Sequence, residues 1–279
     1  MMKTNYHTHC FYCDGTGTPE NYVLEAEKRG LSVLGFSSHS PVPFDTSWNM
    51  KKENLPLYRE DVRKAEKSVS GKLQVYLGLE VDYLRGLWGP DDLADEGLDY
   101  IIGAVHMLKH RGEGEEYLSV DGPDEEFEAL YTETYGRNIK NLVKDYYTMV
   151  CELMERHSFD FLAHFDLVKK KNRNNRYFDE QEAWYRACAL EALTLASEKQ
   201  ITLEINSGGI SRGAIDTVYP GPWLLSEAHR LSVPLVISAD AHRPEHLDFH
   251  FHQSAALCRQ AGYRNVRVYL DGQWQDTGL

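Results

Sequence analysis

The sequence predicts an α/β fold in which seven or eight β/α units form a parallel barrel. Short apolar runs alternate with longer amphipathic stretches almost from end to end. The short runs are rich in β-branched and aromatic residues, as expected for strands that are buried on both faces. No linker-like Gly/Ser/Pro stretch and no internal repeat divides the 279 residues. We therefore expect one domain spanning residues 1–279.

The expected strands are brief and follow one another at barrel-like spacing. Seven runs qualify: residues 3–6, 33–36, 73–79, 100–105, 159–163, 202–205 and 235–238. Residues 266–270 are a further candidate, which leaves the count at seven or eight.

Helices are expected between the strands. The first, residues 19–29, follows Thr18, a good N-cap, and precedes Gly30, a good stop signal. The others are expected at residues 54–70, 125–157, 179–199, 223–231 and 246–261. The stretch 125–157 is long for one helix, and we expect a break near Gly136. The acidic, Gly-containing piece 110–126 is interpreted as an excursion over one rim.

Composition limits the classes of function. A formal net charge of −13 argues against a general nucleic-acid binder, which needs a basic surface to displace the counterions of phosphates. The amino-terminal residues lack the apolar core of a signal peptide, and no run approaches membrane-spanning length. The five cysteines lack the regular spacing of a disulfide framework. Cys10 and Cys13 have the spacing of a redox pair, but loop thiols near a metal are the simpler interpretation. We expect a cytoplasmic protein.

A side chain able to bind metal follows each expected strand. In chain order these are His7 and His9, His39, Glu80, His106, His164, Glu204 with Asn206, and Asp240 with His242. In a barrel the carboxyl ends of the strands converge on one face, where barrel enzymes keep their chemistry. His7 and His9 are two apart on a strand, so both rings face the same side. Glu80 lies among apolar residues, where burial without a cation would be costly.

The types of ligand indicate the metals. Imidazole and carboxylate without thiolate suit zinc, iron or manganese. A catalytic zinc usually takes three protein ligands, so this set is too large for one ion. Two or three divalent ions that share a bridging carboxylate fit it better, and such a centre can clamp a phosphoryl group.

The ordered motifs resemble those of the polymerase-and-histidinol-phosphatase (PHP) family over roughly residues 5–245. They are His7-Thr8-His9, Asp14-Gly15, Ser37-Ser38-His39-Ser40, Glu80-Val81-Asp82, Gly103-Ala104-Val105-His106, His164-Phe165-Asp166 and Asp240-Ala241-His242. The resemblance implies a distorted seven-stranded, TIM-like β/α barrel with a trinuclear site at the carboxyl ends of its strands. Many relatives have Asp where this chain has Ser38.

The resemblance also implies how the ligands divide among the metals. One metal takes four ligands, His7, His9, Glu80 and Asp240. Glu80 bridges to a second metal, which His106 and His164 complete. Asp14, His39 and His242 hold a third. Asp82 and Asp166, each two residues beyond a ligand, are interpreted as carboxylates that orient a histidine.

Two basic segments are candidates for binding phosphate. Residues 169–176 follow the fifth strand, and residues 208–213 offer backbone N–H groups and one guanidinium after the sixth. A solvated loop is the alternative interpretation of the first segment. Arg212 is the first candidate, Lys169 or Lys170 the second and Arg243 the third. Asn206 is expected to orient substrate or a metal-bound water.

The resemblance implies hydrolysis of L-histidinol phosphate to L-histidinol and phosphate, a step of histidine biosynthesis. We expect a metal-bridging hydroxide to attack phosphorus and Asp240 or His242 to protonate the leaving alkoxide. Glu80, as the bridging ligand, is counted with Asp240 and His242 among the expected catalytic residues.

Three alternatives stay open. The first is a phosphoesterase of the same family that acts on a nucleotide, a sugar phosphate or phosphotyrosine. The second is an amidohydrolase-like C–N hydrolase, although Glu80 stands where that chemistry needs a carbamylated lysine. The third is a metal-stabilised binding module without catalysis. The expected partner is a small-molecule phosphate ester, with no nucleic acid and no membrane; the oligomeric state stays open.

Overall fold

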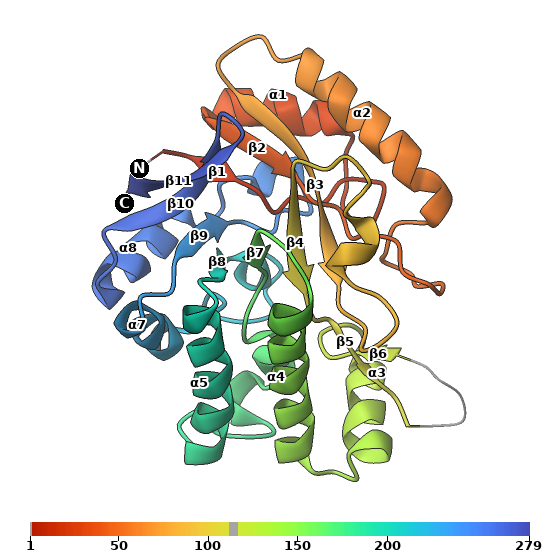
Figure 1. Ribbon diagram of the computed structural model, residues 1–279, viewed down its shortest axis with the longest axis vertical. Helices are drawn as coiled ribbons and strands as arrows, with labels where there is room; N and C mark the ends of the chain where they lie inside the picture. The colour runs from red at the N-terminus through yellow and green to blue at the C-terminus, as the bar shows by residue number, and fades with distance from the viewer. Residues whose placement is uncertain (1, 112–116) are drawn as a thin grey trace.

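Seven parallel strands form the barrel that the sequence predicts (Figure 1). The computed structural model describes residues 2–111 and 117–279. Around the barrel the order is β1 (Thr4–Asn5), β2 (Val33–Phe36), β3 (Gln74–Asp82), β4 (Tyr100–Ala104), β7 (Phe161–Leu162), β8 (Thr202–Asn206) and β9 (Leu235–Ser238). Every neighbouring pair is parallel, so all carboxyl ends meet on one face.

The barrel is nearly closed, because β1 and β9 meet only beyond their carboxyl ends. There the Ala241 N–H donates to the carbonyl of His7 at 3.0 Å, and the His9 N–H donates to Ala241 at 2.9 Å. Lower down, the Asn5 side chain takes the place of a strand ladder. Its Oδ1 accepts from the N–H of Ala239 at 3.1 Å and from the N–H of His7 at 3.2 Å. The join therefore lies directly beside the first candidate ligands.

The helices surround the barrel as predicted, with shorter bounds in most cases (Figure 1). They are α1 (Pro19–Arg29), α2 (Leu55–Lys67), α5 (Ala183–Glu198), α7 (Pro222–Arg230) and α8 (Phe251–Ala261), together with the one-turn α6 (Gly208–Ser211). The bounds of α1 match the prediction, because Thr18 accepts from the Asn21 N–H and Gly30 adopts a φ of 67°.

One expected helix breaks where the sequence predicts, and another begins later than predicted. The stretch 125–157 breaks into α3 (Asp124–Ala129), a π-helical turn (Leu130–Thr134) and α4 (Ile139–Arg156). The break falls at Gly136, as expected, where φ is 56°. The helix expected at 246–261 begins only at Phe251, because the residues before it form a separate 3₁₀ turn and His250 has a φ of 63°.

The predicted excursion over one rim is a small antiparallel pair, β5 (Met107–Lys109) with β6 (Tyr117–Ser119), followed by α3. The middle of this prediction, residues 112–116, lies outside the described residues. Residues 119 and 121–123 line the pocket at the carboxyl ends of the strands. The excursion therefore forms one wall of the site.

The eighth strand candidate is not a barrel strand, which corrects the upper limit of the prediction. β10 (Asn265–Leu270) pairs antiparallel with β11 (Gln273–Gly278). The two strands lie across the amino-terminal end of the barrel, beside both chain termini (Figure 1). The Tyr6 hydroxyl donates to the carbonyl of Tyr269 at 3.1 Å and accepts from the Tyr269 N–H at 2.8 Å. This hairpin closes the end of the barrel opposite the candidate site.

Trp274 of the hairpin is expected to contribute to stability and not to chemistry. Its ring lies 5.4 Å from Tyr6 and 5.9 Å from Phe161, and its Nε1–H donates to Asp160 at 2.7 Å. Trp274→Ala removes a large, partly buried ring, so we expect the free energy of unfolding to fall by about 2–4 kcal/mol. Urea unfolding monitored by circular dichroism measures the change. A large loss of kcat at unchanged stability contradicts this assignment.

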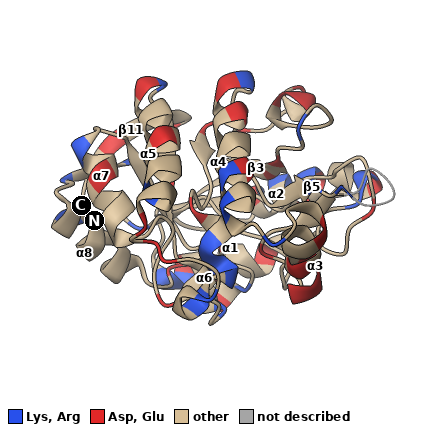
Figure 2. Cartoon of the chain, turned by 90° about the horizontal axis from the view of Figure 1, so that it is seen from below, with Lys and Arg blue, Asp and Glu red and all other residues tan. Residues whose placement is uncertain are grey.

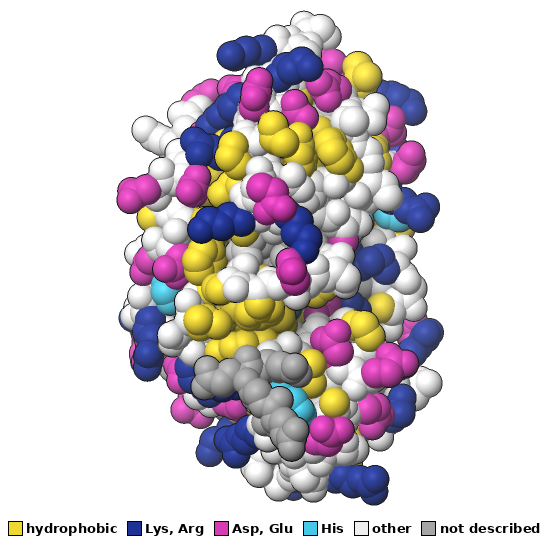
Figure 3. Space-filling model, turned by 90° about the vertical axis from the view of Figure 1, so that its right-hand side faces the viewer, with side chains coloured by type: hydrophobic (Ala, Val, Ile, Leu, Met, Phe, Trp, Pro, Cys, Tyr) yellow, Lys and Arg dark blue, Asp and Glu magenta, His cyan; other side chains and the backbone are white. Residues whose placement is uncertain are grey.

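Charged side chains are unevenly distributed over the surface. Figure 2 shows Lys and Arg gathered beside α6 and Asp and Glu dominating α3. Figure 3 shows a face where apolar patches are separated by charges of both signs. No helix in the described part of the chain is both long enough and apolar enough to span a membrane. A group of basic side chains therefore lies beside α6, although Lys and Arg also occur elsewhere on the surface.

Candidate metal centre

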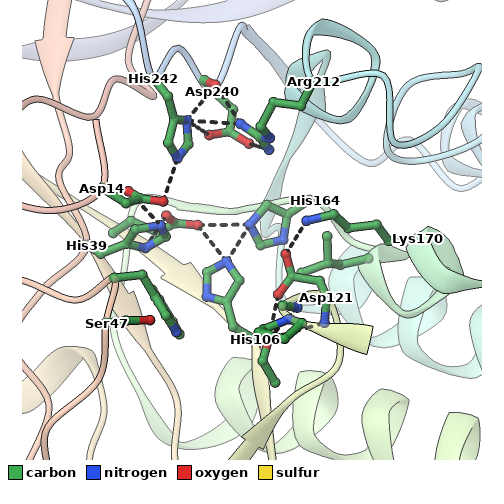
Figure 4. A pocket seen from close by; sticks show the side chains of 16 residues that line it. Asp14, His39, Ser47, His106, Asp121, His164, Lys170, Arg212, Asp240 and His242 are labelled. Atoms are coloured by element: carbon green, nitrogen blue, oxygen red, sulfur yellow. Dashed lines mark hydrogen bonds and ion pairs between the residues drawn. The ribbon is translucent and has the colours of Figure 1, made fainter. Parts of the chain in front are cut away.

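The carboxyl ends of the barrel strands bring the predicted ligands together, and seven of the nine line one pocket (Figure 4). Seven of the nine are almost fully buried: His7, His9, His39, Glu80, His106, His164 and Asp240. The other two lie at the rim, where the Asp14 side chain is 34% exposed and the His242 side chain 18%.

Glu80, within β3, lies at the centre of this group. Its Oε1 is 2.9 Å from Nε2 of His164 and 3.4 Å from Nε2 of His106. Three further ring nitrogens lie within 3.5 Å of its Oε2, those of His7, His9 and His39. One carboxylate therefore lies between two sets of histidines, as a bridging ligand must.

The geometry divides the residues into sets close to those expected. Three groups have ligand atoms within 4.8 Å of one another: His7, His9 and Asp240; Glu80, His106 and His164; and His9, Asp14, His39 and His242. A fourth group, made of His39, Asp82 and His106, shares its histidines with the others. The overlap indicates one continuous centre.

Several atoms of this centre are suited to a cation. His7 Nε2, His9 Nε2, His39 Nδ1 and Glu80 Oε2 are buried and, among the residues that the structure describes, lack a hydrogen-bond partner. Buried polar atoms normally have partners, and atoms without one need an explanation. Unprotonated imidazole nitrogens and carboxylate oxygens without thiolate are ligands that divalent zinc, iron and manganese accept. The residues therefore fit bound divalent metal.

The buried carboxylates of the site are held in their ionised form. Burial acts to raise the pKa of Glu80, but His7, His39 and His106 lower that pKa well below its usual value. Burial also acts to raise the pKa of Asp240, and Arg212 and His7 outweigh it. Both groups are therefore available as anionic ligands near neutral pH.

The two carboxylates expected to orient histidines behave differently. Asp82 Oδ1 accepts from Nδ1–H of His106 at 2.8 Å, as predicted, and fixes that ring with Nε2 facing the pocket. Among the residues that the structure describes, Asp166 hydrogen-bonds to no histidine, which corrects the prediction for it. Its Oδ2 instead accepts from Nζ of Lys169 at 2.7 Å and from the Gly221 N–H at 3.0 Å.

β8 carries Glu204, which contacts a predicted ligand and to which the motif analysis assigned no role. Glu204 Oε1 lies 2.6 Å from Nδ1 of His7, so Glu204 contacts a predicted ligand without being one itself. Asn206, predicted to orient substrate or water, donates through Nδ2 to Glu204 at 2.9 Å and is 3.3 Å from Asp240 Oδ2. A glutamate inside an apolar strand was the available signal, the same one that identified Glu80.

Ser38 interacts with Cys10. Its Oγ accepts from the Cys10 N–H at 3.2 Å, while His39 packs edge-on against Trp48 at 4.6 Å between ring centres. Burial raises the pKa of the Cys10 thiol to about 11, which disfavours the reactive thiolate. Burial also raises the pKa of Cys13 well above its usual value. Both observations favour the interpretation as loop thiols.

Two residues of the centre have backbone conformations that side chains other than glycine rarely adopt. His164 has a φ of 24° and Asp240 a φ of 51°. Each lies two residues beyond the last residue of its strand, where a left-handed residue turns the chain sharply and keeps the side chain over the barrel. Such strain persists only where the surroundings hold it, and it concentrates at functional sites.

A pocket of about 300 Å³ opens above these residues. Figure 4 shows Arg212 and Lys170 reaching in from the side opposite Asp14 and His39. Arg212 Nη2 is 2.8 Å from Asp240 Oδ2, and Lys170 Nζ is 2.7 Å from Asp121 Oδ2. Two of the three predicted positions for phosphate binding thus have a cation in this pocket.

The remaining candidates lie elsewhere. Lys169 is 4% exposed, pairs with Asp166 and does not line this pocket, so Lys170 is the better placed of the two lysines. Arg243 lines an adjoining hollow together with Arg212 and His242. Neighbouring lysines in one 3₁₀ turn point in different directions, which the sequence does not reveal.

A parallel β/α barrel with clustered histidines and carboxylates at the carboxyl ends of its strands defines the class of this protein. It is a metal-dependent hydrolase of the barrel type.

Comparison with known proteins gives the family. Residues 5–208 match the PHP domain, and the chain belongs to the PHP domain family. A protein of Deinococcus radiodurans named a probable histidinol-phosphatase is 33% identical over 93% of this chain and 94% of its own. The histidinol-phosphatase of Bacillus subtilis is 26% identical over 87% and 94%. These matches confirm the predicted family.

A solved structure confirms the predicted fold. The histidinol phosphate phosphatase of Lactococcus lactis, in complex with zinc, L-histidinol and phosphate, superposes with a TM-score of 0.73. The similarity covers 98% of each chain at 20% identity. At this identity the likeness shows the fold alone.

Proposed function

We propose that this chain is a histidinol-phosphate phosphatase, which hydrolyses L-histidinol phosphate to L-histidinol and phosphate. The observation that carries the proposal is the make-up of the pocket. Its floor consists of histidines and carboxylates, Arg212 and Lys170 provide positive charge for a phosphate, and Asp121 provides negative charge for a cationic substrate. The names of the sequence relatives and the ligands of the Lactococcus lactis structure support the same substrate.

The proposed metal ligands divide as the family resemblance implies. His7, His9, Glu80 and Asp240 would hold one divalent ion, Glu80, His106 and His164 a second, and Asp14, His39 and His242 a third. Zinc is supported by the complex of the Lactococcus lactis protein, and iron and manganese suit the same ligands. When bound, such ions supply two things: neutralisation of phosphoryl charge and water of lowered pKa.

The side chains of the pocket bind and orient the substrate. The Arg212 guanidinium is held by the Asp240 carboxylate and presents its remaining N–H donors to phosphate oxygens. Lys170 adds a second positive charge to the pocket, and its ammonium group is held in place by Asp121. The alkoxide that leaves needs a proton. Of the two expected donors, His242 is the candidate for giving it, since it lines the pocket while the Asp240 carboxylate is held in its ionised form.

Asp121 is expected to select substrates with a positive charge. Its Oδ1 accepts from the Ser119 hydroxyl at 2.9 Å and its Oδ2 from Lys170, so the carboxylate is fixed in the pocket wall. Asp121→Asn should lower kcat/KM for L-histidinol phosphate about 10- to 100-fold, because a charge-assisted contact is lost. p-Nitrophenyl phosphate, which carries no cation, should lose much less. An unchanged ratio between the two substrates contradicts this role.

The function is tested by phosphate release from L-histidinol phosphate by the metal-reconstituted protein. The same assay is run with nucleotides, sugar phosphates and phosphotyrosine. A kcat/KM for L-histidinol phosphate well above the others, and absent in His7→Ala and His164→Ala, supports both substrate and site. Poor and equal cleavage of every ester rejects the substrate. Preferred cleavage of another ester assigns that ester instead.

A further inference from the structure

β8 places two polar side chains inside the barrel without supplying a proposed metal ligand. Glu204 and Asn206 are both 0% exposed. They are two residues apart on one strand, so they point to the same side. Glu204 uses both carboxylate oxygens: Oε1 lies 2.6 Å from Nδ1 of His7, while Oε2 accepts from the His164 N–H at 3.1 Å and from the Asn206 amide at 2.9 Å.

The contact with His7 fixes the tautomer of that ring. An ionised carboxylate only accepts hydrogen bonds, so His7 must carry its proton on Nδ1. In the neutral ring this leaves Nε2 as the acceptor, and Nε2 faces Glu80 Oε2 at 3.1 Å. This is the nitrogen that the first proposed metal position requires.

The contact with His164 is made by the main chain. The N–H of His164 donates to Glu204 at the residue whose φ is 24°. Holding this strained backbone fixes where the His164 ring points, which is toward Glu80 Oε1. Glu204 therefore acts on a ligand of the second proposed position as well.

Asn206 extends the same network to a third strand. Its Oδ1 accepts from the Gly208 N–H at 2.8 Å, which leaves the amide N–H groups for Glu204 and Asp240. Ligands from β1, from the end of β7 and from the end of β9 are thereby linked through one buried pair.

We propose that Glu204 is a positioning residue that prepares two metal positions at once, those of His7 and of His164. The proposal rests on the metal centre described under the proposed function. Asp82 provides the contrast, because its carboxylate orients the ring of one proposed ligand, His106. Loss of Glu204 should weaken metal binding at both positions, and loss of Asp82 at one.

Glu204→Gln is the sharpest variant because it keeps the size and removes one acceptor. The new amide group must face either His7 or the two donors at Oε2. In the first case the His7 ring accepts from the amide at Nδ1 and carries its proton on Nε2, where metal would bind. In the second orientation, the NH₂ group of the glutamine faces the N–H of His164 and the amide N–H of Asn206, so no hydrogen bond forms there. No orientation of glutamine satisfies all three partners.

Zinc affinity, measured by competition with a chromophoric chelator, tests the proposal on wild type, Glu204→Gln and Asp82→Asn. Metal content is measured by mass spectrometry and the melting temperature of each metal-free protein is recorded. We expect Glu204→Gln to weaken two zinc equivalents about 10- to 100-fold each, and Asp82→Asn one. If the glutamine variant does not fold, Glu204→Asp keeps the charge but is too short to reach both partners, and the same pattern is expected.

Two results overturn the proposal. Wild-type zinc affinity in Glu204→Gln, with only a lower melting temperature, makes Glu204 a purely structural residue. Weakening of a single equivalent removes the claim that it acts on two positions. A wild-type chain that binds no zinc, iron or manganese instead rejects the metal centre itself, so the two failures are distinguishable.

Discussion

Glu80→Gln should lower kcat/KM for L-histidinol phosphate on the order of 10³-fold or more. The carboxylate of Glu80 contacts ring nitrogens from both sets of histidines. A glutamine presents one oxygen and one NH₂ group, and the NH₂ group faces ring nitrogens that would bind metal. The loss corresponds to about 4 kcal/mol of transition-state stabilisation, a reasonable share for metal catalysis.

Steady-state kinetics and metal content measure this effect together. Asp160→Asn is the matched control, a carboxylate at the opposite end of the barrel that accepts from Trp274 and from the Ile101 N–H. It should cost about 1–2 kcal/mol of stability and leave metal content and kcat unchanged. Activity of Glu80→Gln within tenfold of wild type would show that Glu80 does not bridge metals.

Arg212→Ala is expected to lower kcat/KM about 10²- to 10³-fold. The guanidinium lies in the pocket with one N–H on Asp240 and another 2.9 Å from Nδ1 of His242. Removal takes away a fixed donor for the phosphate in a partly enclosed site, where such donors have their largest effect. Inorganic phosphate should also inhibit the variant more weakly, because the same contact holds the product.

Arg212→Lys separates charge from geometry. Lysine keeps the charge but lacks the planar fork, so we expect partial recovery only. Arg173→Ala serves as the surface control, since that guanidinium pairs with the exposed Asp216 at 3.3 Å. Phosphate inhibition of Arg212→Ala equal to that of the wild type would remove Arg212 from the phosphate site.

The sequence predicted the structure best where a single local signal determines where a helix begins, ends or breaks. Thr18 and Gly30 set both ends of α1, and a left-handed Gly136 divides the long helical stretch. The ligand residues were predictable because a parallel barrel gathers the carboxyl ends of all its strands. The arrangement follows from the topology, whatever the details of packing.

Other features depend on contacts distant in sequence. Residues 266–270 are a short run rich in β-branched and apolar residues, as the barrel strands are, and the pairing with β11 shows that they form a hairpin. The different directions of Lys169 and Lys170 depend on Asp166 and Asp121, which lie on separate segments. One domain spanning residues 1–279 stays a prediction, and the packing of the hairpin against the barrel supports it.

The distribution of the ligands along the chain has a consequence for synthesis. The proposed ligands begin at His7 and end at His242, and the join between the first and last barrel strands includes the backbone of His7, His9 and Ala241. A nascent chain therefore carries most of its histidines long before it has Asp240. The bridging position of Glu80 is complete only when the last strand arrives. Under the proposed division, the metal positions that include Asp240 and His242 are therefore the last to have all their ligands, whereas Glu80, His106 and His164 are together by the fifth barrel strand.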